Sequence, residues 1–276
     1  MPLSSPPLLP TDPQHFAGRH VLVTGASRGI GWAVAKAFAA AGASLSLVGR
    51  DAASLQQRAA EITGPQNSAT LQNSVRAFAA DVADEAAIGK AINDAQAAQG
   101  PLDILVNNAG FGASKPFAKM DTGHWREMLN VNLDGVFFAT RAAIPGLLSR
   151  PQARVITIAS TAGLTGYGYV AAYCAAKHGA VGLMRALARE YAKRDITFNA
   201  VCPGYVDTEM TETSIRTIVE KTGRSREQAL AELTAGNPQG RLVKPEEVAA
   251  TVLWLAMPAA GAVTGQAIAV AGGEVM

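Results

Sequence analysis

The sequence predicts an α/β fold built on a doubly wound parallel sheet of about seven strands, and three observations support this prediction. Short apolar and β-branched runs alternate with longer stretches in which alanine, leucine and charged residues recur at helical spacing. A glycine-rich turn, TGASRGIG, directly follows the first of these runs. The 276 residues, 49% of them hydrophobic, are enough to bury one large core.

Each apolar run fits one strand, and the helical stretches between them fit crossover helices on both faces of a Rossmann-like sheet. Ligands of such folds bind beyond the carboxyl ends of the strands, so functional residues should follow strands. The predicted strands are HVLVTG at 20–25, ASLSLVG at 43–49, VRAFAAD at 75–81, LDILVNN at 102–108, RVITIAS at 154–160, ITFNAVC at 196–202 and QAIAVAG at 266–272.

The chain divides into a flexible, proline-rich arm at 1–16 and a single domain at 17–276. Within the domain, residues 205–241 break the strand-helix rhythm with two helix-like pieces, at 211–223 and 225–236. We interpret this segment as a small helical substrate lid, because long insertions in compact domains are usually functional or disordered. The alternative is an insertion that only completes the surface.

The composition argues against several classes of function. The 24 basic and 22 acidic residues give a net charge of +2 without a basic stripe, so no nucleic-acid partner is expected. The apolar stretch at 251–265 is interrupted and shorter than the roughly 20 residues of a membrane span. Cys174 and Cys202 lack CxxC spacing, so neither a disulfide framework nor a metal site is expected. With no signal-peptide pattern at the start, a cytoplasmic protein is expected.

The glycine-rich turn precedes an apolar helix at 32–43, which predicts a phosphate-binding site. Gly25 permits the tight turn, while Gly29 and Gly31 let the backbone approach a pyrophosphate that faces the free N–H groups of the helix. A purely conformational need for glycine at this junction is the alternative. The residues assigned to this part of a dinucleotide site are Gly25, Ser27, Arg28, Gly29, Ile30 and Gly31.

The end of the second strand predicts the choice of cofactor. Enzymes that prefer NAD usually place a carboxylate here for the ribose 2′-hydroxyl, but this chain has Gly49 followed by Arg50. Arg50 and Arg28 offer guanidiniums to a 2′-phosphate, which favours NADP(H) and leaves NAD(H) possible. The alternatives are that both arginines only lie in solvent, or that Asp51 occupies Arg50.

A catalytic group is expected after the fifth strand. Ser160 ends that strand, and thirteen residues later YCAAK places Tyr173 and Lys177 four apart on one helical face. A neighbouring ammonium favours a phenolate, so Tyr173 should exchange a proton nearer neutral pH. Ser160 can donate a hydrogen bond to a substrate oxygen. An isolated YxxxK spacing would more often be an exposed helix face.

From about residue 16 to the C-terminus, the chain resembles the short-chain dehydrogenase/reductase family. The resemblance implies a catalytic tetrad of Asn132, Ser160, Tyr173 and Lys177, with Lys177 also holding the nicotinamide ribose and Asn132 helping to hold a water. As a set, the motifs are specific. In family order they are TGASRGIG at 24–31, NNAG at 107–110, NVN at 130–132, IAS at 158–160, YCAAK at 173–177 and PG at 203–204.

The same resemblance implies further cofactor contacts beside the adenine, along the ribose and around the carboxamide. For the asparagines of NNAG, satisfying backbone groups without touching a ligand is the alternative. These implied contacts are Asp81, Val82, Asn108, Ala109, Gly110, Tyr173, Lys177, Pro203, Gly204, Val206 and Thr208.

Within the family, the likeness is to ketoacyl-thioester reductases, hydroxyacyl-CoA dehydrogenases and polyketide ketoreductases. A carbonyl or alcohol substrate is therefore expected, with an acyl thioester as one candidate. Lys193 and Arg194 are candidates for docking an acidic carrier or the CoA phosphate, although complementing a helix dipole explains them equally well. An NAD-dependent alcohol or hydroxysteroid dehydrogenase and a non-catalytic dinucleotide-binding oligomer are the rival functions.

The resemblance also implies a homo-oligomer, with a tetramer expected. The predicted long helices at 121–149 and 169–194 carry apolar residues beyond one stripe, and such faces need partners. Deep packing of both helices within a monomer is the alternative.

Overall fold

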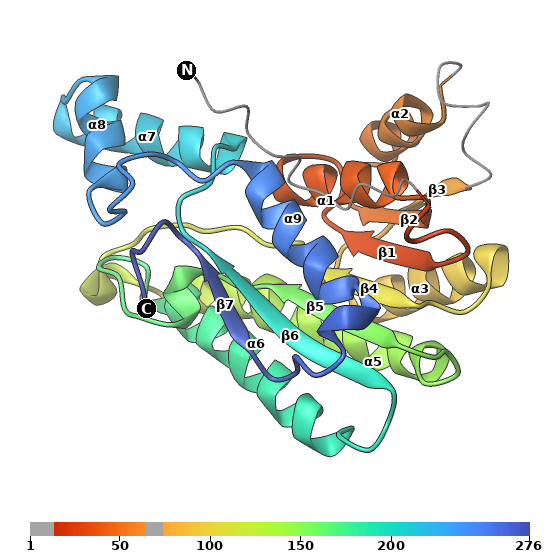
Figure 1. The fold of residues 1–276 in the computed structure, drawn as a ribbon. Coiled ribbons are helices and arrows are strands. Elements are labelled where there is room, and N and C mark those ends of the chain that lie inside the picture. The colour runs from red at the N-terminus through yellow and green to blue at the C-terminus, as the bar shows by residue number, and fades with distance from the viewer. Residues whose placement is uncertain (1–13, 65–73) are drawn as a thin grey trace, which may run out of the picture.

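The computed structural model describes residues 14–64 and 74–276. Its centre is a seven-stranded, fully parallel sheet with the order β3-β2-β1-β4-β5-β6-β7 (Figure 1). The order reverses between β1 and β4, which is where doubly wound sheets open a crevice for ligands. All seven predicted strands are confirmed. They are β1 (His20–Thr24), β2 (Ser44–Gly49), β3 (Val75–Ala79), β4 (Ile104–Asn107), β5 (Ala153–Ile158), β6 (Ile196–Pro203) and β7 (Ala267–Val270).

Helices cover both faces of the sheet, as the doubly wound class requires (Figure 1). Helices α1 (Gly29–Ala40), α2 (Ala52–Thr63) and α9 (Pro245–Ala256) pack on one face, in one apolar cluster. Helices α3 (Glu85–Gln99), α5 (Gly135–Leu147) and α6 (Ala171–Glu190) pack on the other. Strands β1, β5 and β6 are buried along their whole length because both of their faces are covered.

Successive strand residues enter opposite layers of the core. Leu22 belongs to the α3–α5–α6 layer, whereas its neighbours Val21 and Val23 belong to the α1–α2–α9 layer. The register pairs Val23 with Leu47 of β2 and with Val106 of β4. This continuous apolar sheet fixes the positions of the strand ends, and it thereby places the polar residues that follow them.

The N-terminal boundary differs from the prediction at its edge. Most of the expected arm, residues 1–13, lies outside the described residues. Phe16, however, is buried, with its ring 5.0 Å from that of Phe38 in an edge-to-face arrangement. Its backbone N–H donates to the carbonyl oxygen of Ala41 at 2.7 Å. The packed domain therefore includes Phe16, because this aromatic side chain fills a site beside α1.

The expected long helix at 121–149 is interrupted. Helix α4 (Thr122–Leu129) leads into a π-helical turn, η2 (Asn130–Asp134), before α5 begins. The side-chain amide of Asn132 donates to the carbonyl oxygen of Met128, four residues earlier, at 3.0 Å. This side chain competes for the acceptor that a continuous α-helix would use, and a π-helical turn of this kind is frequent at functional sites. The 3₁₀ turns within the described ranges are η1 (Phe117–Lys119), η3 (Thr161–Gly163) and η4 (Pro258–Ala260).

The inserted segment forms the two helices that the sequence predicts, α7 (Glu209–Thr222) and α8 (Arg226–Thr234). A capping box starts α8: the hydroxyl of Ser225 accepts from the backbone of Gln228, whose side chain accepts in return. A parallel bridge between Val206 and Val243 closes the base of the insertion. In Figure 1, α7 and α8 project beyond the carboxyl ends of the strands.

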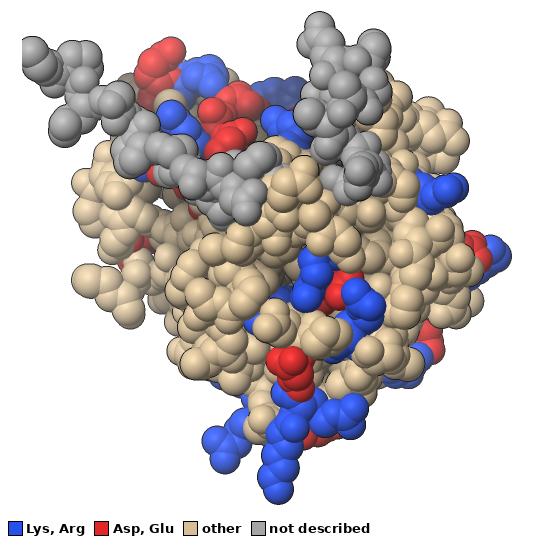
Figure 2. Space-filling view, turned by 45° about the vertical axis from the view of Figure 1, so that its right-hand side comes forward, with Lys and Arg blue, Asp and Glu red and all other residues tan. Residues whose placement is uncertain are grey.

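Charged side chains on the face shown in Figure 2 lie in small mixed groups separated by uncharged surface. Several ion pairs of the described residues have both partners exposed, as for Lys90 with Asp94 and Arg224 with Glu232. Exposed pairs contribute about 0–1 kcal/mol each, so the buried apolar layers hold this fold together. Among the described residues, no helix has the length and apolar character that crossing a membrane requires.

Candidate active site

The three residues expected to carry the chemistry meet at the carboxyl end of β5. Ser160 lies two residues after the last residue of the strand and accepts a hydrogen bond from the backbone of Ala162 at 3.1 Å, which starts the turn η3. Tyr173 lies in the first turn of α6, and Lys177 follows one turn later. The Lys177 ammonium lies 5.6 Å from the centre of the Tyr173 ring and donates to the carbonyl oxygen of Ile158 at 2.9 Å. The structure therefore brings these side chains together as the spacing predicts.

Asn132 joins the group through the π-helical turn. Its amide nitrogen donates to the carbonyl oxygen of Phe111 at 3.0 Å, and its amide oxygen accepts from the N–H of Phe111 at 3.3 Å. A Cβ atom at Gly110 would lie 2.7 Å from that amide oxygen and 3.4 Å from the Lys177 ammonium. Gly110 therefore leaves the space in which Asn132 and Lys177 approach each other.

Burial dominates the ionisation of the central pair. It raises the pKa of Tyr173 to about 12, although hydrogen bonding with Ser160 acts in the opposite direction. Burial also lowers the pKa of Lys177 to about 8. The expected lowering of the Tyr173 pKa by a neighbouring ammonium is wrong for this structure, because desolvation of the phenolate outweighs favourable interactions. Tyr173 is thus protonated at neutral pH, the form that donates a proton.

The glycine-rich turn is held by a residue from another strand. Asn108, just after β4, donates through its amide nitrogen to the carbonyl oxygens of Thr24 and Gly25, at 2.9 and 3.1 Å. Gly25 has a φ of +66°, and a Cβ at Gly31 would come 2.3 Å from the Gly25 oxygen. Only glycines allow this close packing. The amide nitrogen of Asn108 thus supports the turn, in line with the alternative that the sequence left open.

The amino end of α1 is open for an anion. Arg28 occupies the N-cap position, and among the described residues no side chain accepts from the first N–H groups of the helix. Such unpaired N–H groups and the helix dipole attract phosphate. Gly29 (φ +54°) lies against the methyl group of Thr208, which would be 3.3 Å from a Cβ there. The turn and the start of the inserted segment therefore border the same space.

Arg50 has the freedom that 2′-phosphate binding requires. It is exposed at the end of β2 and forms no ion pair with any residue in the described ranges. Asp51 does not occupy it, because its carboxylate caps α2 and accepts from Ala53, Ser54 and the Ser54 hydroxyl. These bonds, first of all that from the Ser54 hydroxyl, lower the pKa of Asp51.

Arg28 is placed differently from what we expected. Its guanidinium pairs with the carboxylate of Glu209 in the first turn of α7, at 2.7 Å. Both side chains are largely exposed, at 69% and 64%. Arg28 thus connects the glycine-rich turn to the inserted helices, and Glu209 is a competitor that sequence reasoning missed. The two residues are 181 positions apart, so only the fold shows their contact.

The other expected cofactor positions line the same edge of the sheet. Asp81 follows β3 and accepts from the backbone of Ala83 at 3.0 Å. Val82 is buried, and a Cβ at Gly135 of α5 would lie 2.9 Å from it. The remaining members lie after β1, in the first turn of α1, after β4, at the end of β6 or at the start of the insertion; they are Ser27, Ile30, Ala109, Pro203, Gly204, Val206 and Thr208.

Lys193 and Arg194 lie away from this edge. They come after α6 and immediately before β6, so they lie at the amino end of that strand. The candidate active site is at the carboxyl end. A carrier docked on these two residues would therefore lie at the opposite ends of the strands from Tyr173. Their position after the last turn of α6 fits better with basic residues that complement the dipole of that helix.

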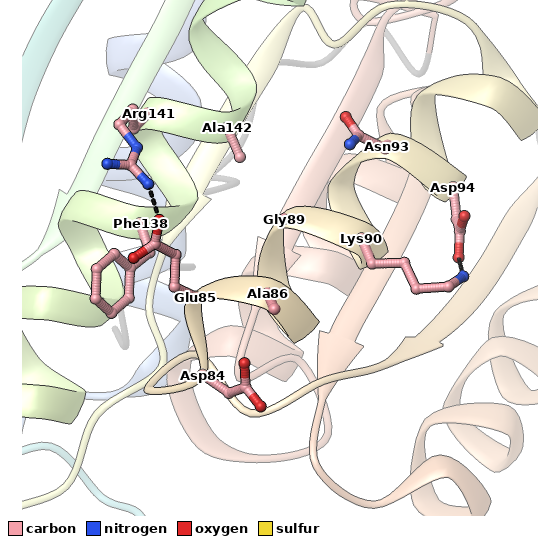
Figure 3. A pocket seen from close by; sticks show the side chains of 10 residues that line it. All are labelled: Asp84, Glu85, Ala86, Gly89, Lys90, Asn93, Asp94, Phe138, Arg141 and Ala142. Carbon is pink, nitrogen blue, oxygen red and sulfur yellow. Dashed lines mark hydrogen bonds and ion pairs between the residues drawn. The ribbon is translucent and has the colours of Figure 1, made fainter.

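A separate groove of about 940 Å³ lies between α3 and α5 (Figure 3). It is crossed by the ion pair of Glu85 with Arg141, and Phe138 forms part of its wall. None of the expected catalytic residues lines it. Within residues 14–64 and 74–276, no group of three or more His, Cys, Asp or Glu side chains is placed to hold a metal ion.

Comparison with known proteins agrees with this geometry. Residues 19–218 match the short chain dehydrogenase family, and the chain belongs to that family. The protein is therefore an oxidoreductase.

Relatives and solved structures cover nearly the whole chain. The chain is 37% identical over 258 residues to acetoacetyl-CoA reductase of Shinella zoogloeoides, covering 93% of this chain and 98% of the relative. It is 36% identical over 263 residues to the 3-oxoacyl-(acyl-carrier-protein) reductase FabG of Escherichia coli, covering 95% and 99%. A variant of actinorhodin polyketide ketoreductase with NADPH superimposes with a TM-score of 0.85 at 36% identity, covering 93% and 97%.

Proposed function

We propose that the protein is an NADP(H)-preferring ketoreductase that acts on a 3-oxoacyl thioester or a related ketone. The observation that carries this proposal is the meeting of Ser160, Tyr173 and Lys177 beside an open, glycine-lined helix terminus. Relatives named as reductases of acetoacetyl-CoA and of 3-oxoacyl groups on a carrier protein support the substrate class.

The residues present fit a dinucleotide phosphate. A dinucleotide phosphate requires close backbone approach, which the packed glycines allow, and N–H groups, which the start of α1 offers. It also requires a cation for the 2′-phosphate, and the guanidinium of Arg50 forms no ion pair within the described residues. We assign the pyrophosphate to the turn around Gly29, the 2′-phosphate to Arg50, and the ribose hydroxyls next to the nicotinamide to Lys177. When bound, the cofactor supplies the hydride.

The chain supplies the proton and the polarisation of the carbonyl. In this proposal Ser160 donates a hydrogen bond to the substrate oxygen, and Tyr173 transfers its phenolic proton to the same oxygen. The raised pKa of Tyr173 keeps that proton in place at neutral pH, so the residue is in the form that a general acid requires. Lys177 lies close enough to stabilise the phenolate left behind. Asn132 holds the backbone of Phe111, and thereby positions Gly110 beside the ammonium of Lys177.

Two rival functions make different predictions. An NAD-dependent dehydrogenase should turn over with NADH and should not lose cofactor affinity when Arg50 is replaced, whereas the proposed ketoreductase should prefer NADPH. A non-catalytic dinucleotide-binding oligomer would have no reason to keep Tyr173, Lys177 and Ser160 in contact.

The test is to follow the absorbance loss of NADPH and of NADH against a panel of 3-oxoacyl thioesters, cyclic ketones and quinones. We expect turnover with NADPH on at least one 3-oxoacyl compound and a lower kcat/KM with NADH. Turnover with NADH alone would overturn the cofactor assignment. No turnover with any panel member would overturn the proposed ketoreductase.

A further inference from the structure

A carboxylate from the C-terminal tail reaches the catalytic loop. After β7, Gly272 and Gly273 take positive φ angles of 62° and 94°, and the chain turns. The half-buried Glu274 that follows accepts a hydrogen bond from the hydroxyl of Tyr167 at 2.5 Å. Tyr167 belongs to the loop between Ser160 and Tyr173. The tail is thereby joined to the segment that carries the proposed chemistry.

The second carboxylate oxygen lies over the end of β6. A Cβ at Gly204 would come 2.7 Å from Glu274 Oε2, and Gly236 at the end of the insertion faces the same side chain at 3.5 Å. Within the described residues, Oε2 accepts no hydrogen bond from the protein. Glu274 therefore has one oxygen bound to Tyr167 and one oxygen free, between the strand end and the inserted helices.

The surroundings connect this carboxylate with the substrate side of Tyr173. Tyr167 also hydrogen-bonds with Thr161, the neighbour of Ser160. Burial raises the pKa of Tyr205, which is 38% exposed, and the nearby carboxylate of Glu274 acts in the same direction. Tyr167 follows β5, Tyr205 follows β6 and Glu274 follows β7, so all three lie at the carboxyl edge of the sheet, where Ser160 and Tyr173 also lie.

We propose that Glu274 selects substrates whose non-reacting end is uncharged, so that the enzyme reduces neutral ketones and thioesters and rejects free oxo acids. This inference rests on the proposed function. A substrate carboxylate placed beside the carbonyl would lie near the Glu274 carboxylate, and like charges in a partly buried site repel strongly. An ester or thioester at the same place meets no such repulsion. Specificity of this kind comes from a repulsive element as much as from attraction.

Two oxo compounds that differ only in this charge provide the test. Ethyl acetoacetate and acetoacetate are compared by kcat/KM with NADPH at pH 7.5, in wild type and in Glu274→Gln. We expect wild type to favour the ester, and we expect Glu274→Gln to raise kcat/KM for acetoacetate at least about tenfold. The value for the ester should stay within about twofold. Glu190→Gln removes an equal charge at the exposed far end of α6 and should change neither value.

A second variant separates selection from a structural role. Tyr167→Phe removes the hydrogen bond but leaves the Glu274 charge, so the preference for the ester should persist. If the pair only ties down the tail, both variants will lower kcat/KM for both compounds alike, and the inference is overturned. An unchanged ratio in Glu274→Gln, with wild type active on the ester, overturns this inference alone. A wild type that reduces no carbonyl compound overturns the proposed function as well.

Discussion

Arg28 in the glycine-rich turn donates to Glu209 in the first turn of α7 at 2.7 Å, so a residue assigned to the cofactor already has a protein partner. A 2′-phosphate that binds Arg28 must displace this carboxylate. We expect Glu209→Gln to tighten NADPH binding by about two- to fivefold, because an exposed ion pair is worth about 0–1 kcal/mol. NADH, which lacks the phosphate, should bind as before.

Fluorescence titration of both cofactors checks this prediction. Glu212→Gln is the matched control, since Glu212 lies on the same helix but pairs with Arg226 inside the insertion. Equal tightening of NADPH and NADH by Glu209→Gln would mean that the pair acts on the position of α7, and Arg28 would lose its phosphate role.

Replacement of Tyr173 tests the source of the proton. Tyr173→Phe keeps the ring in place and removes the hydroxyl, so kcat should fall by about 10²- to 10⁴-fold, the usual contribution of a general acid. The dissociation constant of NADPH should change by less than about twofold. Tyr169→Phe is the control, because Tyr169 is 71% exposed just before α6. Near-normal turnover in Tyr173→Phe would refute the mechanism.

We expect Arg50 to affect cofactor choice more than Arg28, because Arg50 is free of ion pairs among the described residues. Arg50→Ala should weaken NADPH binding by about 1.5–3 kcal/mol, the scale of a charge-assisted hydrogen bond, and leave NADH nearly unaffected. Isothermal titration with both cofactors measures this difference. Equal losses for the two would assign Arg50 to the fold or to the adenine.

Gly49→Asp should move the preference further, toward NADH. A Cβ at Gly49 would lie 3.5 Å from Leu55, an ordinary contact, so the larger side chain fits. The new carboxylate would repel a 2′-phosphate and accept from a free ribose hydroxyl. The ratio of kcat/KM values for NADPH and NADH should fall below that of Arg50→Ala. A ratio that stays at the wild-type value would show that the ribose does not reach Gly49.

Burial of Lys177 predicts a pH dependence of stability. Its pKa is about 8 in the folded protein, against an ordinary value of 10.5. Between these values the unfolded chain binds more protons, so this group's contribution to stability rises with pH. Relative to Lys177→Met, wild type should gain on the order of 3 kcal/mol from pH 8 to pH 10.5.

Urea unfolding of wild type and Lys177→Met across this pH range measures the difference between their free energies of unfolding. Lys90→Met, at an exposed site on α3, should show no such trend relative to wild type. A flat difference for Lys177→Met would mean that Lys177 is solvated in the folded protein.

The sequence was sufficient wherever a contact follows from local spacing or from a strand end. Tyr173 and Lys177 are one helical turn apart, and Ser160 lies just beyond the end of a buried strand, so their meeting could be predicted. Contacts between distant segments could not. Arg28 with Glu209 and Tyr167 with Glu274 depend on how the insertion and the tail fold back over the sheet.

Local geometry also escaped prediction where a side chain overrides a regular pattern. The apolar spacing at 121–149 indicates one helix, but the Asn132 amide takes the Met128 oxygen and produces a π-helical turn. The pKa of Tyr173 is a similar case, since spacing shows a neighbouring ammonium but not the depth of burial. The sequence alone does not show whether the amide nitrogen of Asn108 contacts a ligand or the backbone. In the structure it donates to the carbonyl oxygens of Thr24 and Gly25.

The expected tetramer remains a prediction, and the structure shows where to test it. Phe137 on α5 is 41% exposed, with the guanidinium of Arg141 lying 4.9 Å from its ring centre. An exposed aromatic residue on a helix that also carries apolar core residues is typical of an interface. Light scattering at micromolar concentration should give a multiple of the 28.5 kDa mass of one chain.

Phe137→Glu should lower the measured mass toward that of smaller species, because a buried, unpaired carboxylate opposes association. Lys221→Glu, at an exposed position near the end of α7, should leave the mass unchanged. A one-chain mass for wild type would reject the oligomer, and a Phe137→Glu protein with wild-type mass would place the interface on another face.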